Sequence, residues 1–518
     1  MATSEEHSLI VPIDDAATSH EINPRRKRIR RLAEIGLAFA VVFAVMYTIE
    51  FAGPAILDND GYYHIKWSRM LRDSAPHLPE FNSLPLTTLN ERQYADHHFL
   101  FHVLLIPFTY GDLRPGAKQA AVFFSSLALT TLFWLLLVYK IRFRWLWLAL
   151  LIGSAQPFLY RMSMTRAPGL SIVLLGLGCY LILERKYLLL AVLGFVFVWS
   201  YSLFPLLFVF ALAYAVAEYL SSRGIDLKPA LASLVGIAAG LVINPYFPKN
   251  VSLMMEHALM KLPANYSVSV GVEWYPYETW PLAEWSGLAL IVFLAGLFAF
   301  DFKRTGADLK PLFFLIISTV FLVMLFKSRR FVEYFPPFAV LFAAFTIAPR
   351  IESAGEWRPS RLRDKVIFSI GAGVAGLVLV IWIGSNVWGA YTSVRDEDDP
   401  FKFKGAAEWL AANTPVDSMV FNTDWDQFPM LFYYNSHNRF ITGLDPTYLY
   451  NRDPDLWSVY EKVVAGDQSA PARVIRERFG AEYVVTENRR SDFMDSVDET
   501  EDFERVYSDP NVAVLKIR

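Results

Sequence analysis

The sequence predicts an α-helical polytopic membrane domain of about 11 spans followed by a soluble α/β domain. Of its 518 residues, 54% are hydrophobic, and the mean hydropathy is +0.30. Apolar stretches of roughly 17–25 residues recur through the first three quarters of the chain, and each can cross a hydrocarbon core of about 30 Å. They lack the polar face that a helix needs in a soluble protein. Residues 389–518 are instead charged and rich in turns, and they suffice for one small core.

The N-terminus carries a polar leader, 1–24, and a basic run, Arg25–Arg31, ahead of an apolar stretch. The small-residue pattern of a cleavage site does not follow that stretch, so we interpret it as a first span and not as a signal peptide. Residues 1–32 are therefore predicted to form a basic cytoplasmic leader.

The membrane domain is predicted over 33–388. Its spans are placed at 33–53, 118–139, 145–160, 169–183, 187–202, 204–220, 229–244, 286–300, 311–326, 334–348 and 366–388. Short loops rich in Lys and Arg collect on the cytoplasmic side of a membrane. With the N-terminus inside, that side receives the basic loops Lys140–Arg144, Glu184–Lys186, Arg223–Lys228, Lys303–Lys310 and Arg350–Lys365. This agreement predicts an inner (plasma) membrane protein with a cytoplasmic N-terminus and a periplasmic or extracellular C-terminal domain.

Three long segments then lie outside: 54–117, 245–285 and the domain 389–518. Within the first, 99–112 is apolar but flanked by polar residues, which predicts a half-helix or an interfacial helix on the outer side. The outer domain has 24 acidic and 14 basic side chains, a net charge of −10, which leaves +7 for the rest of the chain. An acidic domain argues against nucleic acid as a partner, because phosphate binding needs positive charge. The single cysteine, Cys179, excludes an internal disulfide.

The outer domain shows an α/β pattern. Helical periodicity is found at Phe403–Ala412, Pro446–Val464 and Ala472–Phe479, and strand patterns at Met419–Phe421 and Tyr483–Thr486. Two further strand patterns, Phe503–Tyr507 and Val512–Ile517, flank a turn and predict a hairpin.

The first candidate motif, Leu57–His64, follows the first span directly. Asp58, Asp60 and His64 lie within eight residues, and such a group suits a divalent cation or an acceptor hydroxyl. The alternative interpretation is an Asn-Asp-Gly turn that ends a helix.

The second candidate motif is Tyr94–His102. His98 and His102 share a helix face at i, i+4 spacing, and with Asp96 and His97 they are candidate metal ligands. The alternative is a helix capped by Asp96 and followed by amphipathic interface residues.

Arginines at outer turns form the third group. Arg161, Arg166, Arg329 and Arg330 lie on the side that the distribution of basic loops disfavours, which predicts a compensating role such as bidentate binding of phosphate. The alternative is pairing with nearby acids, for example Arg330 with Glu333.

Two outer segments carry the remaining candidates. Glu273 lies among aromatic residues in the long loop 245–285, where it suits contact with a sugar or peptide beneath a lid. Asp424-Trp425-Asp426 follows a predicted strand and forms a compact polar recognition point. The alternatives are an aromatic belt at the membrane interface for the first segment and an Asx-rich turn for the second.

The order of these features resembles, over most of the chain, the catalytic subunits of oligosaccharyltransferases and, more broadly, the GT-C type membrane glycosyltransferases. In that family an acidic residue after the first span binds the metal and touches the acceptor amide, which implies this role for Asp60. The glutamate of the family's late outer loop matches Glu273, and its arginine for the lipid-linked diphosphate matches Arg330. Asp424-Trp425-Asp426 resembles its Trp-Trp-Asp motif, which reads the acceptor, and 503–517 resembles its terminal hairpin.

The chain also departs from the family. The family has a second acidic pair in the outer turn where this chain has Tyr160–Arg166, and only Arg161 matches there. Either Asp96 with His97 or His98 completes a Mg or Mn site with Asp58 and Asp60, or the reaction runs without a bound metal. Asp424 replaces the first tryptophan of the acceptor motif, so recognition of a peptide sequon does not follow.

The resemblance implies a glycosyltransferase that takes a sugar or oligosaccharide from a polyprenyl-linked phosphate or diphosphate. The acceptor is a protein, lipid or glycan on the outer face, and membrane lipids surround the enzyme. Asp60 is expected to activate the acceptor as a base or through a metal, Arg330 to stabilise the leaving phosphate, and Glu273 to hold the acceptor. The alternatives are a transporter or flippase of lipid-linked saccharides and a non-catalytic assembly subunit.

Overall fold

A computed structural model describes residues 24–261, 268–304, 308–353 and 362–518. Within them, seven helices are long and apolar enough to cross a membrane. These are α1 (Pro24–Glu50), α4 (Leu113–Val138), α9 (Pro205–Ser222), α12 (Thr279–Ala299), α13 (Lys310–Lys327), α14 (Phe335–Ser353) and α15 (Leu362–Arg395). The prediction of a polytopic membrane domain is confirmed. The leader 1–24, apart from its last residue, and parts of the inner loops 303–310 and 350–365 lie outside the described residues.

The predicted number of spans is not confirmed, because the other apolar helices are shorter. They are α5 (Arg144–Gly153), α7 (Pro168–Leu183), α8 (Tyr187–Ser200) and α10 (Lys228–Val242). The stretch predicted as a span over 145–160 divides at Ser154 and Ala155 into α5 and α6 (Gln156–Met162). Pro157 explains the break, since it has no N–H to continue a helix and fits only a first turn. The basic run is also helical, because α1 begins at Pro24.

Small residues let the membrane helices approach closely. On α10, a Cβ at Gly236 would lie 1.9 Å from the backbone oxygen of Ala191 in α8, and one at Gly240 would lie 2.9 Å from that of Phe195. Only glycine fits at Gly236, so this pair of helices packs backbone against backbone, as small residues permit inside membranes.

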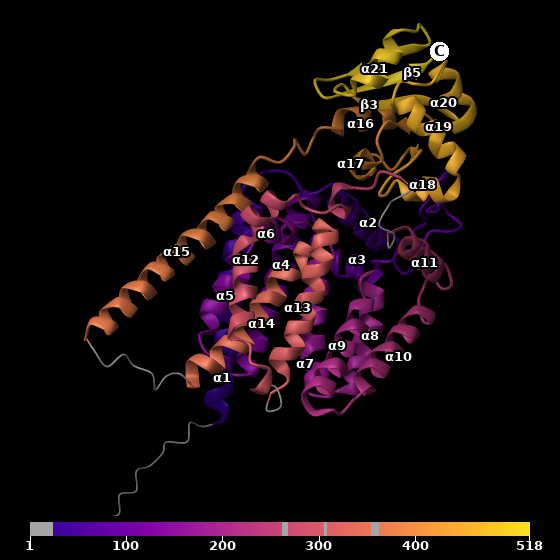
Figure 1. Ribbon diagram of the computed structural model, residues 1–518. Helices are drawn as coiled ribbons and strands as arrows, with labels where there is room; N and C mark the ends of the chain where they lie inside the picture. The colour runs from indigo at the N-terminus through magenta and orange to yellow at the C-terminus, as the bar shows by residue number, and fades with distance from the viewer. Residues whose placement is uncertain (1–23, 262–267, 305–307, 354–361) are drawn as a thin grey trace, which may run out of the picture.

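The outer segments form short helices at the end of the bundle on which the C-terminal domain stands (Figure 1). They are α2 (Asp60–Ser74), α3 (Phe99–Leu105), η1 (Ile106–Thr109), α11 (Lys249–Lys261), η2 (Val272–Trp274) and η4 (Arg329–Glu333), while η3 (Phe302–Arg304) lies elsewhere. The short helix predicted within 99–112 is thus present as α3 and η1.

The C-terminal domain contains a five-stranded mixed sheet in the order β2-β1-β3-β5-β4. Its strands are β1 (Met419–Asn422), β2 (Arg439–Phe440), β3 (Ala481–Glu487), β4 (Phe503–Ser508) and β5 (Val512–Ile517). β1 runs parallel to β2 and β3, whereas β5 pairs antiparallel with β3 and β4. The predicted hairpin and both predicted strands are present.

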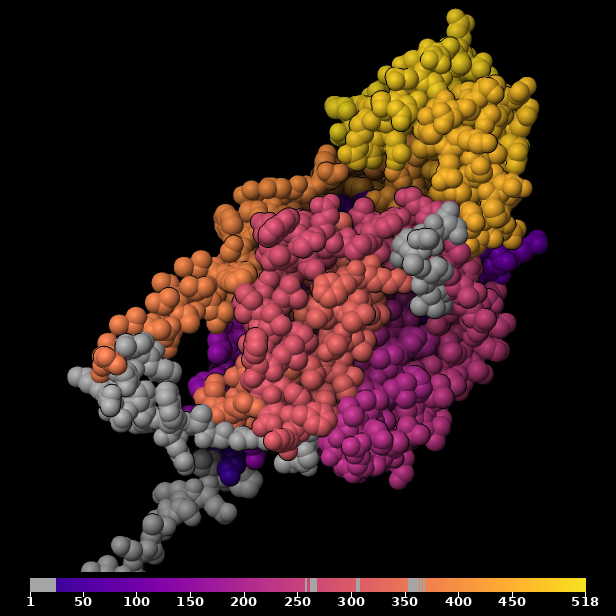
Figure 2. Space-filling model, in the orientation of Figure 1, coloured from indigo at the N-terminus to yellow at the C-terminus, as the bar shows by residue number. Residues whose placement is uncertain are grey.

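Helices surround this sheet. They are α16 (Lys404–Asn413), η5 (Trp425–Gln427), α17 (Phe428–Tyr434), α18 (Thr447–Arg452), α19 (Pro454–Val464), α20 (Pro471–Phe479) and α21 (Ser491–Asp498). The helix predicted over 446–464 is two helices, because Asp453 is extended and Pro454 begins a new first turn. The last membrane helix, α15, leans away from the bundle, and a gap separates part of it from the other helices (Figure 2).

Candidate functional site

A cavity opens at the end of the membrane domain that carries the C-terminal domain. It encloses about 820 Å³ of empty space, its open mouth included. Its charged and hydrogen-bonding walls include Asp60, His64, Asp96, His97, His98, His102, Arg166, Tyr201, Glu273, Arg330, Asp445 and Tyr448. Residues from α2, the α3 region, two outer turns, the long outer loop and the outer domain therefore meet at one place.

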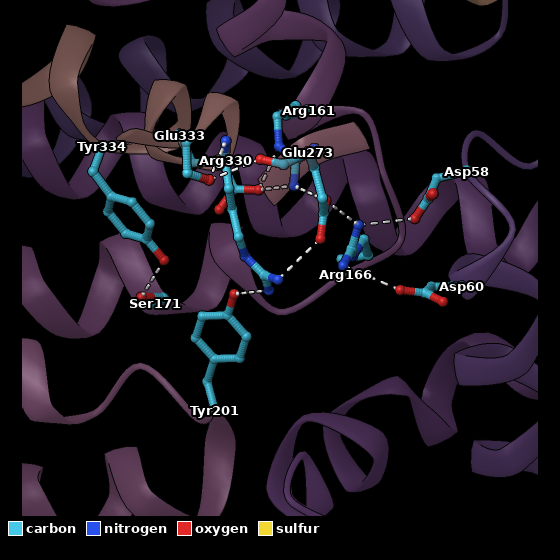
Figure 3. A network of polar contacts seen from close by, with 11 residues as sticks. Asp58, Asp60, Arg161, Arg166, Ser171, Tyr201, Glu273, Arg330, Glu333 and Tyr334 are labelled. Carbon is cyan, nitrogen blue, oxygen red and sulfur yellow. Dashed lines mark hydrogen bonds and ion pairs between the residues drawn. The ribbon is translucent and has the colours of Figure 1, made fainter. Parts of the chain in front are cut away.

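The acidic motif after α1 faces Arg166. Asp58 has a left-handed backbone (φ 67°), and this turn carries the chain into α2, which begins at Asp60. The guanidinium of Arg166 places Nη1 3.2 Å from Asp58 Oδ2 and Nη2 3.1 Å from Asp60 Oδ2 (Figure 3). The turn thus presents two carboxylates to a single cation.

Glu273 joins three arginines. Its Oε2 lies 2.8 Å from Arg161 Nη2 and 3.2 Å from Arg166 Nη1, and its Oε1 lies 3.0 Å from Arg330 Nη1 (Figure 3). The backbone around Glu273 is also held, because Ser328 Oγ donates to the Glu273 carbonyl at 2.8 Å. The long outer loop is therefore fixed to the segment that carries Arg330.

Arg330 has further partners. Its Nη2 donates to the hydroxyl of Tyr201 at 2.8 Å, and its guanidinium carbon lies 5.0 Å from the centre of the Trp274 ring. The adjacent Arg329 points elsewhere: its Nε donates to the Pro276 carbonyl at 3.1 Å, and it does not line the cavity. Of the two neighbouring arginines, only Arg330 contributes to this network.

The network shifts the pKa values of Asp60 and Glu273 in opposite directions. Burial, together with the nearby Asp58, Glu273 and Asp426, outweighs Arg166 and raises the pKa of Asp60 to about 7. Burial also disfavours the charge on Glu273, but Arg166, Arg330 and Arg161 outweigh it and hold the pKa of Glu273 well below its usual range. Glu273 is thus a permanent anion, whereas Asp60 gains or loses a proton near neutral pH.

The outer domain contacts this site through the Asp424-Trp425-Asp426 segment. Asn59 Nδ2 donates to Asp426 Oδ2 at 2.9 Å and to the Asp426 carbonyl at 3.1 Å. The indole of Trp425 lies over Gly271, where a Cβ would be 3.6 Å from it. Asp424 instead forms an ion pair with Arg490 inside the outer domain. Two of the three predicted recognition residues therefore reach the membrane domain.

The residues of the Tyr94–His102 motif form a buried hydrogen-bonded chain. Asp96 Oδ2 lies 2.7 Å from His102 Nδ1 and accepts from Trp67 Nε1 at 3.0 Å. His102 Nε2 lies 2.7 Å from Nδ1 of His64. His98 stacks against Tyr201 with 5.3 Å between ring centres, so this side of the cavity adjoins Arg330.

These residues do not form a ready metal site. Within the described residues, no group of three or more His, Cys, Asp or Glu side chains is arranged to hold a metal ion. Asp58 and Asp60 are bound to the cation of Arg166, and Asp96 is bound to Trp67 and His102. In this structure Arg166 thus occupies the two carboxylates that a divalent cation would need, and the function proposed below routes no step through a metal.

The sequence predicted some residues of this site and missed others. Asp60, Arg166, Glu273 and Arg330, all predicted, do come together. Tyr201 was missed, since a tyrosine between two apolar helices carries no motif. The link between His64 and His102 was also missed, although both histidines lie in segments singled out for chemistry.

Comparison with known proteins gives no match to any family profile and none to a curated sequence. Solved structures do match. The apo oligosaccharyltransferase of Archaeoglobus fulgidus gives a TM-score of 0.63 at 12% identity, over 88% of this chain and 69% of that chain. The archaeal oligosaccharyltransferase AglB from the same organism, in complex with an inhibitory peptide and a dolichol-phosphate, gives 0.64 at 12% identity, over 89% and 70%.

ArnT from Cupriavidus metallidurans, bound to undecaprenyl phosphate, matches nearly end to end. The TM-score is 0.52 at 15% identity, over 93% of this chain and 98% of that chain. The predicted likeness to oligosaccharyltransferases and GT-C type proteins is thereby confirmed for the fold, which is a membrane domain followed by a soluble domain. The chain is an integral membrane protein of this architecture.

Proposed function

We propose that this protein transfers a sugar or oligosaccharide from a polyprenyl-linked phosphate or diphosphate to an acceptor at the outer face of the membrane. The observation that carries the proposal is the cavity in which Asp60, Arg166, Glu273 and Arg330 meet. These residues come from distant parts of the chain, and their shared place at the edge of the membrane suits a donor whose tail dissolves in lipid while its sugar reaches water.

Arg330 binds the donor phosphate in this proposal. A guanidinium held on two sides, by Glu273 and Tyr201, is already oriented, so little conformational entropy is lost when a phosphate oxygen binds. As the bond to the anomeric carbon breaks, negative charge grows on the leaving phosphate, and the guanidiniums of Arg330 and Arg166 stabilise it. Glu273 is a positioning residue, because it fixes the three arginines.

Asp60 orients the acceptor. Its Oδ2 is held by Arg166, and the carboxylate faces the cavity from the first turn of α2. The acceptor attacks the anomeric carbon, and the bond to phosphate breaks as the new bond forms. Trp425 and Asp426 border the site from the outer domain and contribute to acceptor recognition, with the described parts of the loop 245–285 as a cover.

The structural neighbours support this donor class. AglB was solved with a dolichol-phosphate and ArnT with undecaprenyl phosphate, and both ligands are polyprenyl phosphates. The orientation that we propose, with the N-terminus in the cytoplasm, rests on the basic inner loops.

The test compares two adjacent arginines. The purified protein is reconstituted in liposomes with the lipid-linked saccharides of the producing cells and with membranes from a deletion strain as acceptor. Released polyprenyl phosphate and glycosylated product are then followed by mass spectrometry. Arg330→Met should slow transfer about 100-fold or more. Arg329→Met, the matched control, should leave the rate near that of the unmodified protein.

Two results would overturn the proposal. One is transfer by Arg330→Met at the unmodified rate. The other is movement of donor lipid across the liposome without any transfer, which would favour a flippase.

A further inference from the structure

We infer that the acceptor is a hydroxyl compound and that His64 takes its proton, with His102 and Asp96 fixing the imidazole in the accepting form. The inference rests on the proposed function and deepens it, because it names the chemical class of the acceptor. Its basis is the hydrogen-bonded chain that leads from the buried Asp96 to the cavity wall.

Protein encloses this hydrogen-bonded series of three side chains. His102 is fully buried, and Asp96 and His64 are 4% and 5% exposed. The two contacts, Asp96 to His102 and His102 to His64, are each 2.7 Å long. Such short contacts between buried groups fix the His102 ring in one orientation, since a flipped imidazole would lose both of its partners.

The direction of these hydrogen bonds follows from Asp96, which forms the buried end of the series. Asp96 accepts from Trp67 Nε1 and from the backbone N–H of His98, as a carboxylate does. A carboxylate can only accept, so Nδ1 of His102 carries the hydrogen between them. When the His102 ring carries this one hydrogen, its Nε2 accepts, and Nδ1 of His64 donates. This leaves a lone pair on Nε2 of His64.

His64 stands where an acceptor would be bound. It lies one turn after Asp60 on α2, and residues four apart share a helix face. Both line the cavity together with Arg166 and Arg330. Within the described part of the chain, no side chain hydrogen-bonds to Nε2 of His64, whose Nδ1 meets His102.

The step balances with groups already present. The hydroxyl oxygen of the acceptor forms a bond to the anomeric carbon, and the bond from that carbon to the phosphate oxygen breaks with its electron pair moving to the phosphate. The hydroxyl proton passes to Nε2 of His64. His64 can then release its Nδ1 proton to His102, which brings the positive charge beside Asp96.

A hydroxyl acceptor fits this base, and a carboxamide does not. An alcohol loses its proton to an imidazole as the new bond forms, which is ordinary general base catalysis. A neutral amide nitrogen has its lone pair delocalised into the carbonyl, so it cannot attack first and lose its proton as the bond forms, as a hydroxyl oxygen does. The His64 chain therefore predicts an O-linked product.

The first test is spectroscopic and needs no substrate. The unmodified protein, labelled with ¹⁵N-histidine, should show both His64 and His102 protonated on Nδ1, with assignments from His64→Gln and His102→Gln. Asp96→Ala removes the carboxylate that holds the hydrogen on Nδ1 of His102, so the preference for Nδ1 should weaken in both rings. A hydrogen on Nε2 of His64 in the unmodified protein would overturn the inference.

The second test uses the reconstituted transfer assay. His64→Gln and Asp96→Asn should each slow transfer about 100-fold or more. The exposed His77→Gln serves as the matched control and should not. Normal transfer by His64→Gln, with Arg330→Met inactive, would overturn the inference and leave the proposed function standing. Normal transfer by both would overturn the proposed function itself.

The third test identifies the linkage. Products that the producing cells make and a deletion strain lacks are isolated, and the atom bonded to the anomeric carbon is determined by mass spectrometry and alkaline cleavage. A bond to oxygen supports the inference, and a bond to nitrogen overturns it.

Discussion

Two nitrogens of Arg161, Nε and Nη2, meet the same oxygen of Glu333, at 2.6 and 2.5 Å from Oε1. Glu333 is fully buried and the Arg161 side chain is 9% exposed, so this pair has left water almost completely. It ties α6 to η4 and thereby sets the position of Arg330. The sequence suggested a different pair, Arg330 with Glu333, whereas Arg330 binds Glu273.

Removing one partner of this pair should destabilise the protein. Glu333→Leu leaves the buried Arg161 with less compensation, at an expected loss of about 3–5 kcal/mol. The double variant Arg161→Met/Glu333→Leu removes both charges and should lose less than the sum of the two single variants. Thermal unfolding in detergent, followed by tryptophan fluorescence, measures this, and additive losses would contradict it.

The pH dependence of transfer should report Asp60. The pKa of Asp60 is about 7, so the rate should rise as pH increases through neutrality, when the carboxylate gains the charge that holds it against Arg166 in its orienting position. Asp58→Asn removes a neighbouring negative charge, which lowers the pKa of Asp60 and should move this rise to lower pH. A rise that moves to higher pH in Asp58→Asn would contradict the assignment.

Docking of the outer domain should depend on Asn59. Asn59→Ala removes both bonds to Asp426 and should broaden the distance distribution between spin labels at Leu78 and Val416, two exposed positions. Exposed Asn511→Ala is the control. Because Cys179 is buried, introduced cysteines can be labelled selectively.

Acidification should stabilise docking of the outer domain, even though the bond that Asn59 donates favours the ionised form of Asp426. Burial and the nearby Asp58 raise the pKa of Asp426 to about 6, above its ordinary value, so the docked form binds a proton more readily than the separated form. Docking therefore gains stability as pH falls through 6, and the label distances should narrow between pH 7.5 and 5.5. Broadening on acidification would count against this contact as the link.

Glycine at position 236 should be essential for the pairing of α8 with α10. Gly236→Leu drives a side chain into the backbone of Ala191, and overpacking of this kind costs about 1–3 kcal/mol or more. Gly376→Leu on α15 is the matched control, since nothing lies within 4 Å of the added Cβ. A lower unfolding temperature for the first variant alone is the expected result.

Hydropathy and charge were enough to predict the membrane domain, the outer α/β domain and the side on which the polar motifs gather. These are local properties of the chain, as the match of α16, β3 and the hairpin to the predicted segments illustrates. β2 was missed because only two residues form it, and pairing with β1 holds them. The sequence also could not predict which arginine pairs with which acid, because the pairing depends on how α6, η2 and η4 are placed relative to one another.

Among the seven helices that can span a membrane, α15 is the least enclosed: 6% of its apolar 18-residue stretch is buried. Within a bilayer no polar group of a regular helix is left unsatisfied, so α15 needs no protein neighbour along its length. Acyl chains of surrounding phospholipids will fill the space beside it, and they form part of the packing of this molecule. Extraction that strips these annular lipids should change the tilt of α15, whereas the charged cavity, built from other segments, should keep its shape.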